Sequence, residues 1–443
     1  MPMDRTAFLK TALGAAAGAS FAGSAGRDAL AQSYPAIGTF PEGIKGDSVF
    51  VGLVADLTGP YSADGEDQRK GFELAIEQLN NGTGVMAKIP SLAGKKGLLG
   101  KKLVYKVSDG ETKPDPAVQR ASEFIANDKA LMFTGCVASS ETIALEKLAQ
   151  QQKVIYMTGA SGSNDTTGKD CQRYGFRSQP SAYMVAKALV PVLGKELGKK
   201  RRAVYLVPDY SYGRSVHDSM KEFTEKLGWT TVASVFSPFP TSDFSPYLTN
   251  VANANADTFL NITFGTEAIA STKQAAQFGI LKKMQLVVPN ISTYMPDGVG
   301  AEIMQGVYGT MDWTWRLEER YPLSKLFVAD FRKKFGGTYP RWTAHISYAQ
   351  LAIWADAITR AKTFYPVEVI KTLEAGNPVE LMLGKVFYRA GDHQQVRPVP
   401  VLLGKKPGDM ANKEDFFRVV EVVAGEELLP PLDVTGCKMP AYT

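Results

Sequence analysis

Cysteine and histidine are scarce in this chain, with three of each among 443 residues. The cysteines Cys136, Cys171 and Cys437 lack the Cys-x-x-Cys spacing of zinc and dithiol redox sites, and the histidines stand apart from one another. No glycine-rich phosphate or dinucleotide motif follows a predicted strand, and no complete nucleophile, base and acid set is readable. The sequence therefore predicts no metal and no cofactor, and it argues against an enzyme.

Long apolar runs and blocks of like charge are also missing. After the first segment, no stretch has the ~18 apolar residues that span a bilayer. The net charge of +5 is small for this length and is scattered over short pairs such as Lys95-Lys96 and Arg201-Arg202. These patterns argue against nucleic-acid binding and predict a soluble mature protein, which we expect to be a monomer.

Residues 1–31 have the features of a signal peptide. Arg5 and Lys10 precede a weakly apolar run that starts at Thr11, and Ala29-Leu30-Ala31 offers small residues for cleavage after Ala31. The segment around Arg5 is similar to a twin-arginine signal, but Thr6 stands where the second Arg belongs. We therefore predict export to the periplasm, and both the general secretory and the twin-arginine routes stay open.

Short apolar runs alternate with helical patterns along most of the chain, which predicts parallel sheets covered on both faces. The alternation restarts after Pro180, so the predicted fold is α/β with two doubly wound parallel-sheet lobes. Predicted strands are 49–57, 103–107, 130–134, 154–158, 203–207, 232–236, 258–262, 286–288 and 307–311, and predicted helices cover 72–79, 116–127, 139–151, 185–192, 216–227 and 243–251.

Polar side chains follow several predicted strands, where ligands of parallel α/β sheets bind near helix N-termini. Each has an ordinary structural alternative. Ser139 is also a good N-cap, and this role stabilises a helix by about 1 kcal/mol. The serines of a Gly/Ser-rich segment can simply form a turn. Tyrosines in a loop can simply cover the end of a sheet. The loops are 58–65, 136–140, 158–163 and 208–213, and their candidate residues are Asp64, Ser139, Ala160, Ser161, Ser163, Tyr210 and Tyr212.

The order of these loops and their neighbours forms a longer pattern. Its parts are Val51-Gly52-Leu53-Val54, Leu57-Thr58-Gly59-Pro60-Tyr61, Asp109, Asp115-Pro116, Ser139-Ser140, Phe176-Arg177, Asp209-Tyr210-Ser211-Tyr212-Gly213, Asp243-Phe244-Ser245 and Tyr348-Ala349. The pattern resembles the periplasmic solute-binding proteins of the branched-chain amino acid transporter family, which are leucine-binding-protein-like. The resemblance covers residues 48–395.

The resemblance implies two lobes joined by three hinge crossings, near Ser178, Met311 and Leu383. Lobe one would contain residues 32–178 and 312–383, and lobe two residues 179–311 and 384–443. It also implies that Ser139, Ala160 and the following serines, Ser161 and Ser163, hold a carboxylate-like group. Tyr212 would close from the other lobe, and Phe264 falls at the position of an aromatic lid.

Three positions bear on the ligand. Family members that bind α-amino acids carry an acid where Asn290 stands here, and often another where Ser181 stands. A buried ammonium without a carboxylate partner is costly. Asp64 can substitute for the missing acid, so amino acids stay possible beside a carboxylate or amide without an amino group, such as an aromatic or aliphatic acid.

The resemblance implies an ABC importer receptor that captures a small molecule and docks on a membrane permease. Two other functions stay open: a ligand sensor for a signalling partner, and an α/β hydrolase. The sequence leaves the ligand and the permease unidentified.

The cysteines allow one disulfide and one buried thiol in an oxidising compartment. The Cys pair usual in the family is absent. We predict a Cys171–Cys437 bond because Cys437 lies in a Pro-rich tail that would otherwise fray, and because Cys136 directly follows an apolar strand. A Cys136–Cys171 bond is the alternative.

Overall fold

Five parallel strands form the sheet of the first lobe in a computed structural model that describes residues 46–442. They are β1 (Ser48–Ala55), β2 (Lys102–Asp109), β3 (Met132–Gly135), β4 (Ile155–Thr158) and β5 (Gly175–Arg177), in the order β2-β1-β3-β4-β5. After its first residue β1 is buried throughout, which explains why it reads as an unbroken apolar run. The predicted signal peptide lies outside the described residues.

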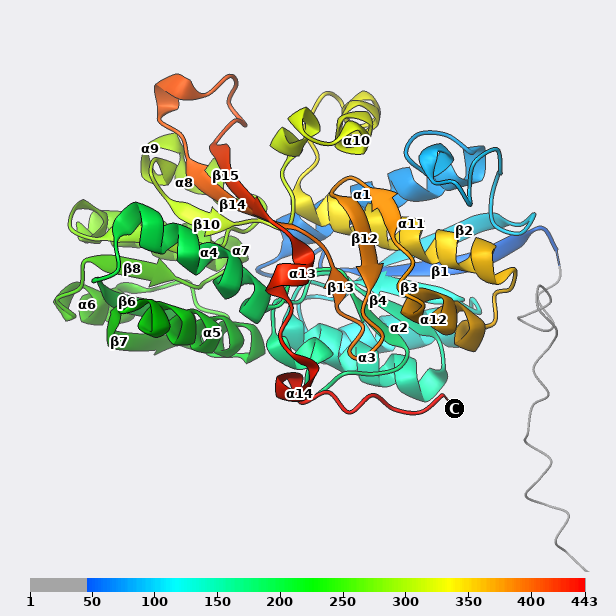
Figure 1. The fold of residues 1–443 in the computed structure, drawn as a ribbon, viewed down its shortest axis with the longest axis horizontal. Helices are drawn as coiled ribbons and strands as arrows, with labels where there is room; N and C mark the ends of the chain where they lie inside the picture. Colours follow the sequence, from blue (N-terminus) through cyan, green and yellow to red (C-terminus); the bar gives the residue numbers. More distant parts are fainter. Residues whose placement is uncertain (1–45, 443) are drawn as a thin grey trace, which may run out of the picture.

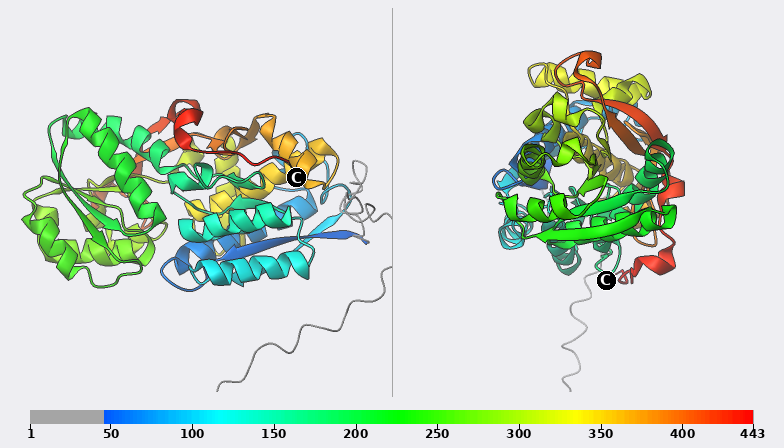
Figure 2. Two further views of the ribbon diagram at one scale, coloured as in Figure 1. Left: turned by 90° about the horizontal axis from the view of Figure 1, so that it is seen from below. Right: turned by 90° about the vertical axis from the view of Figure 1, so that its left-hand side faces the viewer.

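Helices cover both faces of this sheet, and some come from much later in the chain (Figures 1 and 2). Gly71 lets two of them approach closely, because a Cβ there would lie 2.1 Å from the Ala344 carbonyl oxygen. The helices of the first lobe are α1 (Ser62–Asn81), η1 (Met86–Lys88), α2 (Pro114–Ala126), α3 (Ser139–Gln152), η2 (Asn164–Thr167), η4 (Trp315–Glu319), α10 (Pro322–Lys334), α11 (Trp342–Ala361) and α12 (Pro366–Glu374).

The second lobe is built on a seven-stranded sheet and lies beside the first along the long axis of the molecule (Figure 1). Its strands are β6 (Arg202–Pro208), β7 (Thr230–Ser237), β8 (Thr258–Asn261), β9 (Gln285–Asn290), β10 (Tyr308–Thr310), β14 (Val399–Gly404) and β15 (Phe417–Val423), in the order β15-β14-β10-β9-β8-β6-β7. Among these strands only β14 runs against the others, because it pairs antiparallel with β10 on one side and with β15 on the other. Its helices are α4 (Ala182–Leu197), α5 (Ser211–Leu227), α6 (Ser245–Asn253), α7 (Gly265–Gln277), η3 (Ile280–Lys282), α8 (Met295–Val299) and α9 (Ala301–Met304), with η5 (Pro407–Asp409) between β14 and β15.

The third crossing between the lobes differs from the expected position. A small sheet of β11 (Val379–Leu381), β12 (Gly384–Tyr388) and β13 (Gln395–Val396) precedes it. The expected boundary between Leu383 and Gly384 falls in the turn joining β11 to β12, which pair with each other. Gln394 also bridges to Arg177 at the end of β5. The chain therefore reaches the second sheet at β14, and this crossing lies at 397–398.

The C-terminal tail returns to the first lobe, whereas the resemblance implies that residues 384–443 belong wholly to the second. After α13 (Gly425–Leu428) and α14 (Leu432–Thr435), Cys437 forms a disulfide with Cys171. Arg173 Nε adds a 2.8 Å hydrogen bond to the Pro440 carbonyl oxygen. The predicted Cys171–Cys437 pairing is confirmed, and Cys136 is the buried free thiol. Within residues 46–442 no helix has the length and hydropathy of a membrane span.

One buried arginine joins the three crossings. Arg397, at the third crossing, donates to the carboxylate and the backbone carbonyl of Asp312 at the second. It also donates to the Ser178 carbonyl at the first crossing, at 3.3 Å. His345 of α11 lies 3.0 Å from the other Asp312 oxygen. Because the Arg397 and Asp312 side chains are at most 1% exposed, this pair depends on its internal partners.

Asp312→Ala should destabilise the protein by about 3–5 kcal/mol, because it leaves the buried Arg397 guanidinium without its carboxylate. Urea unfolding followed by circular dichroism measures this change. The matched control is Glu222→Ala, which breaks an exposed ion pair with Lys226 and should leave the unfolding free energy nearly unchanged. Equal stability of the two variants would contradict a structural role for the hinge pair.

Candidate functional site

The carboxyl ends of the parallel strands in the two sheets face each other across a cleft. The Pro60 carbonyl oxygen, after β1, accepts a 3.1 Å hydrogen bond from Thr266 N, at the start of α7. Asp64 Oδ1, in α1, accepts one of 3.3 Å from Thr293 N, which follows β9. These bonds join loops of opposite lobes, so the lobes are closed on one another.

Ser139 is the first residue of α3, and Ala138 occupies the N-cap position. The hydroxyl does not cap the helix: Ser139 Oγ accepts a 3.3 Å bond from Ser163 N. The capping contact comes from Glu141, whose Oε2 accepts from Ala138 N at 3.1 Å. The first N–H groups of a helix have no intrahelical acceptor, and its dipole favours an anion there. The start of α3 therefore suits a carboxylate.

The loop after β4 forms hydrogen bonds within the first lobe and also to the second lobe. Ser161 Oγ and Thr166 Oγ1 lie 2.6 Å apart, and Ala160 N donates to the Cys136 carbonyl oxygen at 2.9 Å. Ser163 Oγ reaches across the cleft to Ser215 Oγ of α5, at 3.0 Å. Ser161 and Ala160 thus shape the loop, whereas Ser163 takes part in closure.

Two buried acids lie beneath this wall of the cleft. Asp56 Oδ2 accepts a 2.9 Å bond from Val137 N, and ligand atoms of Asp56, Cys136 and Glu141 lie within 4.8 Å of one another. Burial raises the pKa of Asp56 to about 6 and also raises the pKa of Glu141. The two carboxyl groups accept from Val137 N and Ala138 N, and they hold the loop that leads into α3.

Aromatic rings from both lobes form the opposite wall. The Tyr61 and Tyr210 hydroxyl oxygens are 2.6 Å apart across the cleft. The ring centroid of Phe264 lies 5.5 Å from that of Tyr61, 5.8 Å from that of Tyr212 and 6.0 Å from that of Trp342. Such edge-to-face contacts stabilise the closed arrangement and present an apolar surface to a ligand.

Four buried polar atoms at this wall have no hydrogen-bond partner among the described residues. They are Tyr212 Oη, Asn290 Oδ1, Ser292 Oγ and Trp342 Nε1. A Cβ placed on Gly162 would lie 2.9 Å from the Tyr212 ring and 3.6 Å from Asn290 Nδ2, so Tyr212 and Asn290 lie beside the loop after β4. Buried groups of this kind normally have partners, and a bound ligand would supply them.

Two further carboxyl groups border the aromatic wall. Burial, with a smaller contribution from the neighbouring Asp67, raises the pKa of Asp64 to about 7 although Thr293 donates to it. Burial likewise raises the pKa of Glu267 to about 7, while Thr241 N donates to it at 2.5 Å. Without a cation in the cleft, both groups carry a proton over much of the range below pH 7.

Ser181 has a structural role at a different place. Its Oγ accepts a 3.2 Å bond from Met184 N and caps α4. Together with Asn164, Thr167 and Arg177 it lines a separate cavity of about 80 Å³. Among the residues singled out from the sequence, Ser139, Ser163, Tyr210, Tyr212, Phe264, Asn290 and Asp64 gather at the cleft.

The structure adds cleft residues that sequence reasoning missed. Ser292 follows β9 closely, and Glu267 lies three residues after Phe264, so strand-end position was an available signal for both. Gln179 and Trp342 line a small cavity with Asn290. Trp342 starts a helix that follows no strand end, and its place depends on how α11 packs against α1 within the first lobe.

A family model described as periplasmic binding protein matches residues 48–408. Among known proteins, the Leu/Ile/Val-binding protein homolog 7 of Brucella suis biovar 1 is 22% identical over 346 residues, which cover 76% of this chain and 82% of that protein.

Two solved structures have the same arrangement. An amino acid ABC transporter substrate-binding protein from Pseudomonas fluorescens Pf-5 is 28% identical with a TM-score of 0.78, covering 88% of this chain and 98% of that one. A solute binding protein of an ABC transporter from Rhodopseudomonas palustris BisB5, solved with 3,4-dihydroxy benzoic acid, is 20% identical with a TM-score of 0.72, covering 86% and 98%. The predicted two-lobe α/β fold is confirmed.

Ser139→Ala should weaken binding of a small carboxylate by about 1–3 kcal/mol, because a hydroxyl donor to a charged oxygen is lost. Titration calorimetry with benzoate as the probe measures the change. Ser140→Ala, at the neighbouring half-buried position, is the matched control and should bind as the unmodified protein does. If Ser139→Ala alters only the melting temperature, the hydroxyl serves the loop and not the ligand.

Proposed function

We propose that this chain, which belongs to the periplasmic binding protein family, closes its lobes around a small organic acid or amide without an α-amino group. Proteins of this kind are substrate-binding components of ABC transporters, and they bind solutes without transforming them. In this proposal the protein works in the periplasm as a monomer. Its closed form docks on a membrane permease, which a cytoplasmic ATPase drives.

Asn290 is the observation that carries the proposed ligand class. Its Oδ1 is buried without a partner among the described residues, beside Tyr212 and the loop after β4. An amide can hydrogen-bond a neutral hydroxyl or amide, but it cannot neutralise an ammonium. The carboxylate end would bind at the start of α3, and the body of the ligand would lie against the aromatic wall. The dihydroxy benzoic acid held by the Rhodopseudomonas palustris protein is an acid of this class.

An α-amino acid is the second candidate, because Asp64 and Glu267 border the same wall. An ammonium beside either carboxyl group would favour its ionised form and lower its pKa. The two ligand classes therefore differ in how binding responds to pH.

The expected pH dependence follows from closure. A carboxyl group exposed in an open cleft has a pKa of about 3.9, whereas Asp64 in the closed cleft has one of about 7. Closing the cleft therefore makes Asp64 take up a proton at any pH between these two pKa values. The closed form is fully stabilised below about pH 4, and this stabilisation is lost as the pH rises to about 7. Affinity for an acid without an amino group should fall between pH 5 and pH 7, by up to about tenfold per unit for each such group, and level off above.

The test pairs phenylalanine with 3-phenylpropionate and leucine with 4-methylpentanoate, in calorimetric titrations from pH 5 to pH 8. We expect the acids to bind more tightly than the amino acids and their affinity to fall with rising pH. Asp64→Asn and Glu267→Gln, singly and together, should flatten this slope. Sub-micromolar leucine or phenylalanine binding that Asp64→Asn abolishes would contradict the proposed ligand class and restore an amino-acid receptor.

A further inference from the structure

Trp342, the first residue of α11, forms one side of the ligand cleft. It is 3% exposed, and its ring meets Phe264 edge to face. With Gln179 and Asn290 it lines a cavity of about 10 Å³. Trp342 Nε1 and Asn290 Oδ1 both lack a hydrogen-bond partner among the described residues. Two of the residues that line this cavity therefore carry unsatisfied polar groups.

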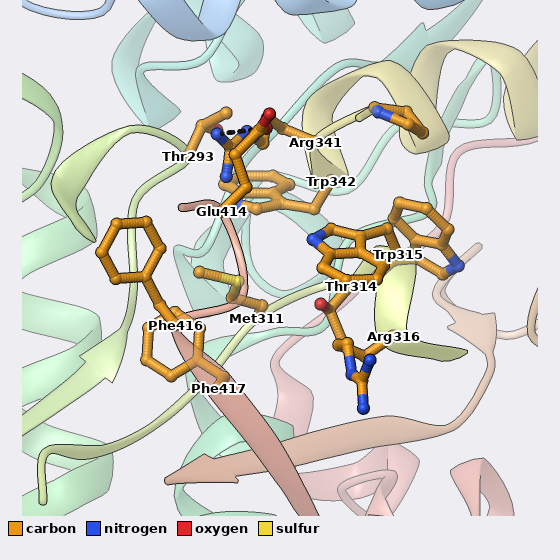
Figure 3. Close-up of a pocket in the computed structure, with 12 residues that line it drawn as sticks. Thr293, Met311, Thr314, Trp315, Arg316, Arg341, Trp342, Glu414, Phe416 and Phe417 are labelled. Atoms are coloured by element: carbon orange, nitrogen blue, oxygen red, sulfur yellow. Dashed lines mark hydrogen bonds and ion pairs between the residues drawn. The ribbon is translucent and has the colours of Figure 1, made fainter. Parts of the chain in front are cut away.

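The same indole also lines a second cavity, which we call the side pocket (Figure 3). The side pocket has a volume of about 20 Å³ and lies between the second crossing, the start of α11 and the segment leading into β15. Most of its wall is apolar and aromatic. The residues that form this wall are Met311, Trp313, Trp315, Trp342, Phe416 and Phe417.

Contacts between the lobes span the rim of the side pocket. Arg341 Nη2 lies 2.9 Å from Glu414 Oε2 and 3.1 Å from Asp297 Oδ1, and both acids belong to the second lobe. Figure 3 shows Arg341 and Glu414 next to the Trp342 ring. Closure of the lobes therefore brings the two sides of the side pocket together, and Trp342 and Met311 line both this pocket and the small cavity beside Asn290.

We propose that Trp342 is a specificity-determining residue that sets the length of ligand the cleft accepts. The inference rests on the proposed function, since it concerns the same cleft. The Trp342 indole, together with Met311, separates the small cavity beside Asn290 from the side pocket. A smaller residue joins the two spaces, and the joined space suits a carboxylate with a longer apolar or aromatic tail, which would lie against Trp313 and Phe416.

The experiment measures affinity by calorimetry along the series phenylacetate, 3-phenylpropionate, 4-phenylbutyrate and 5-phenylpentanoate. For the unmodified protein, we expect affinity to fall beyond a short tail. For Trp342→Ala, each added methylene should raise affinity about fourfold until the side pocket is filled, because each becomes buried against apolar rings. The preferred tail length should therefore increase.

Two variants separate this role from a general loss of structure. Trp342→Phe keeps a ring but lacks the N–H, and it should lower affinity without shifting the preferred length. Trp315→Ala enlarges the side pocket from its outer wall, where Trp315 stacks on Tyr339, and it should also keep the original preference. Circular dichroism confirms that each variant is folded, and Trp342→Leu replaces Trp342→Ala if the latter fails to fold.

The outcomes distinguish this inference from the proposed function. If the unmodified protein binds these acids and Trp342→Ala weakens all of them by the same factor, Trp342 supports the fold and the inference is wrong. If the unmodified protein binds none of the four acids but binds α-amino acids, the proposed ligand class is wrong. A longer preferred tail in Trp342→Ala, with Trp315→Ala unchanged, supports both.

Discussion

The buried ion pair between Arg397 and Asp312 is the constraint on which the two-lobe arrangement depends. One guanidinium holds the third crossing to the second through Asp312 and to the first through the Ser178 carbonyl. Arginine cannot lose its charge in a protein, so separating the crossings would leave a buried charge unpaired. In the proposed closure the lobes rotate about this point, and the far side of the cleft opens or closes.

The closed cleft combines contacts that favour closure with groups that oppose it. Aromatic packing of Tyr61 and Trp342 against Phe264 stabilises the closed form. Buried polar atoms without partners among the described residues, such as those of Tyr212 and Asn290, cost about 1–3 kcal/mol each. A ligand that supplies these partners binds the closed form more tightly than the open one. It shifts the equilibrium between the open and closed forms by the difference between its two binding free energies.

Local sequence patterns locate the parallel strands and the polar residues near their carboxyl ends. The parallel strands of the two sheets appear as apolar runs except β5, whereas β14 and β15 were not predicted. Ser139, Tyr212 and Asn290 lie at or shortly after the ends of three of the predicted strands. The sequence predicts Ser139 as the N-cap of its helix. In the structure Ala138 is the N-cap residue, Ser139 is already the first residue of α3, and Glu141 supplies the capping contact. The third crossing was predicted too early in the chain, because short strands of mixed polarity carry no apolar run. Trp342 was missed because tertiary packing alone brings the start of α11 to the cleft.

Small-angle X-ray scattering tests most directly the claim that ligand binding closes the lobes about the hinge pair. The measurement compares the free protein with the protein saturated by the tightest-binding acid, and uses a non-binding acid at the same concentration as the control. The account predicts that the radius of gyration decreases with the binding acid alone. An unchanged radius of gyration at a saturation established by calorimetry would contradict it.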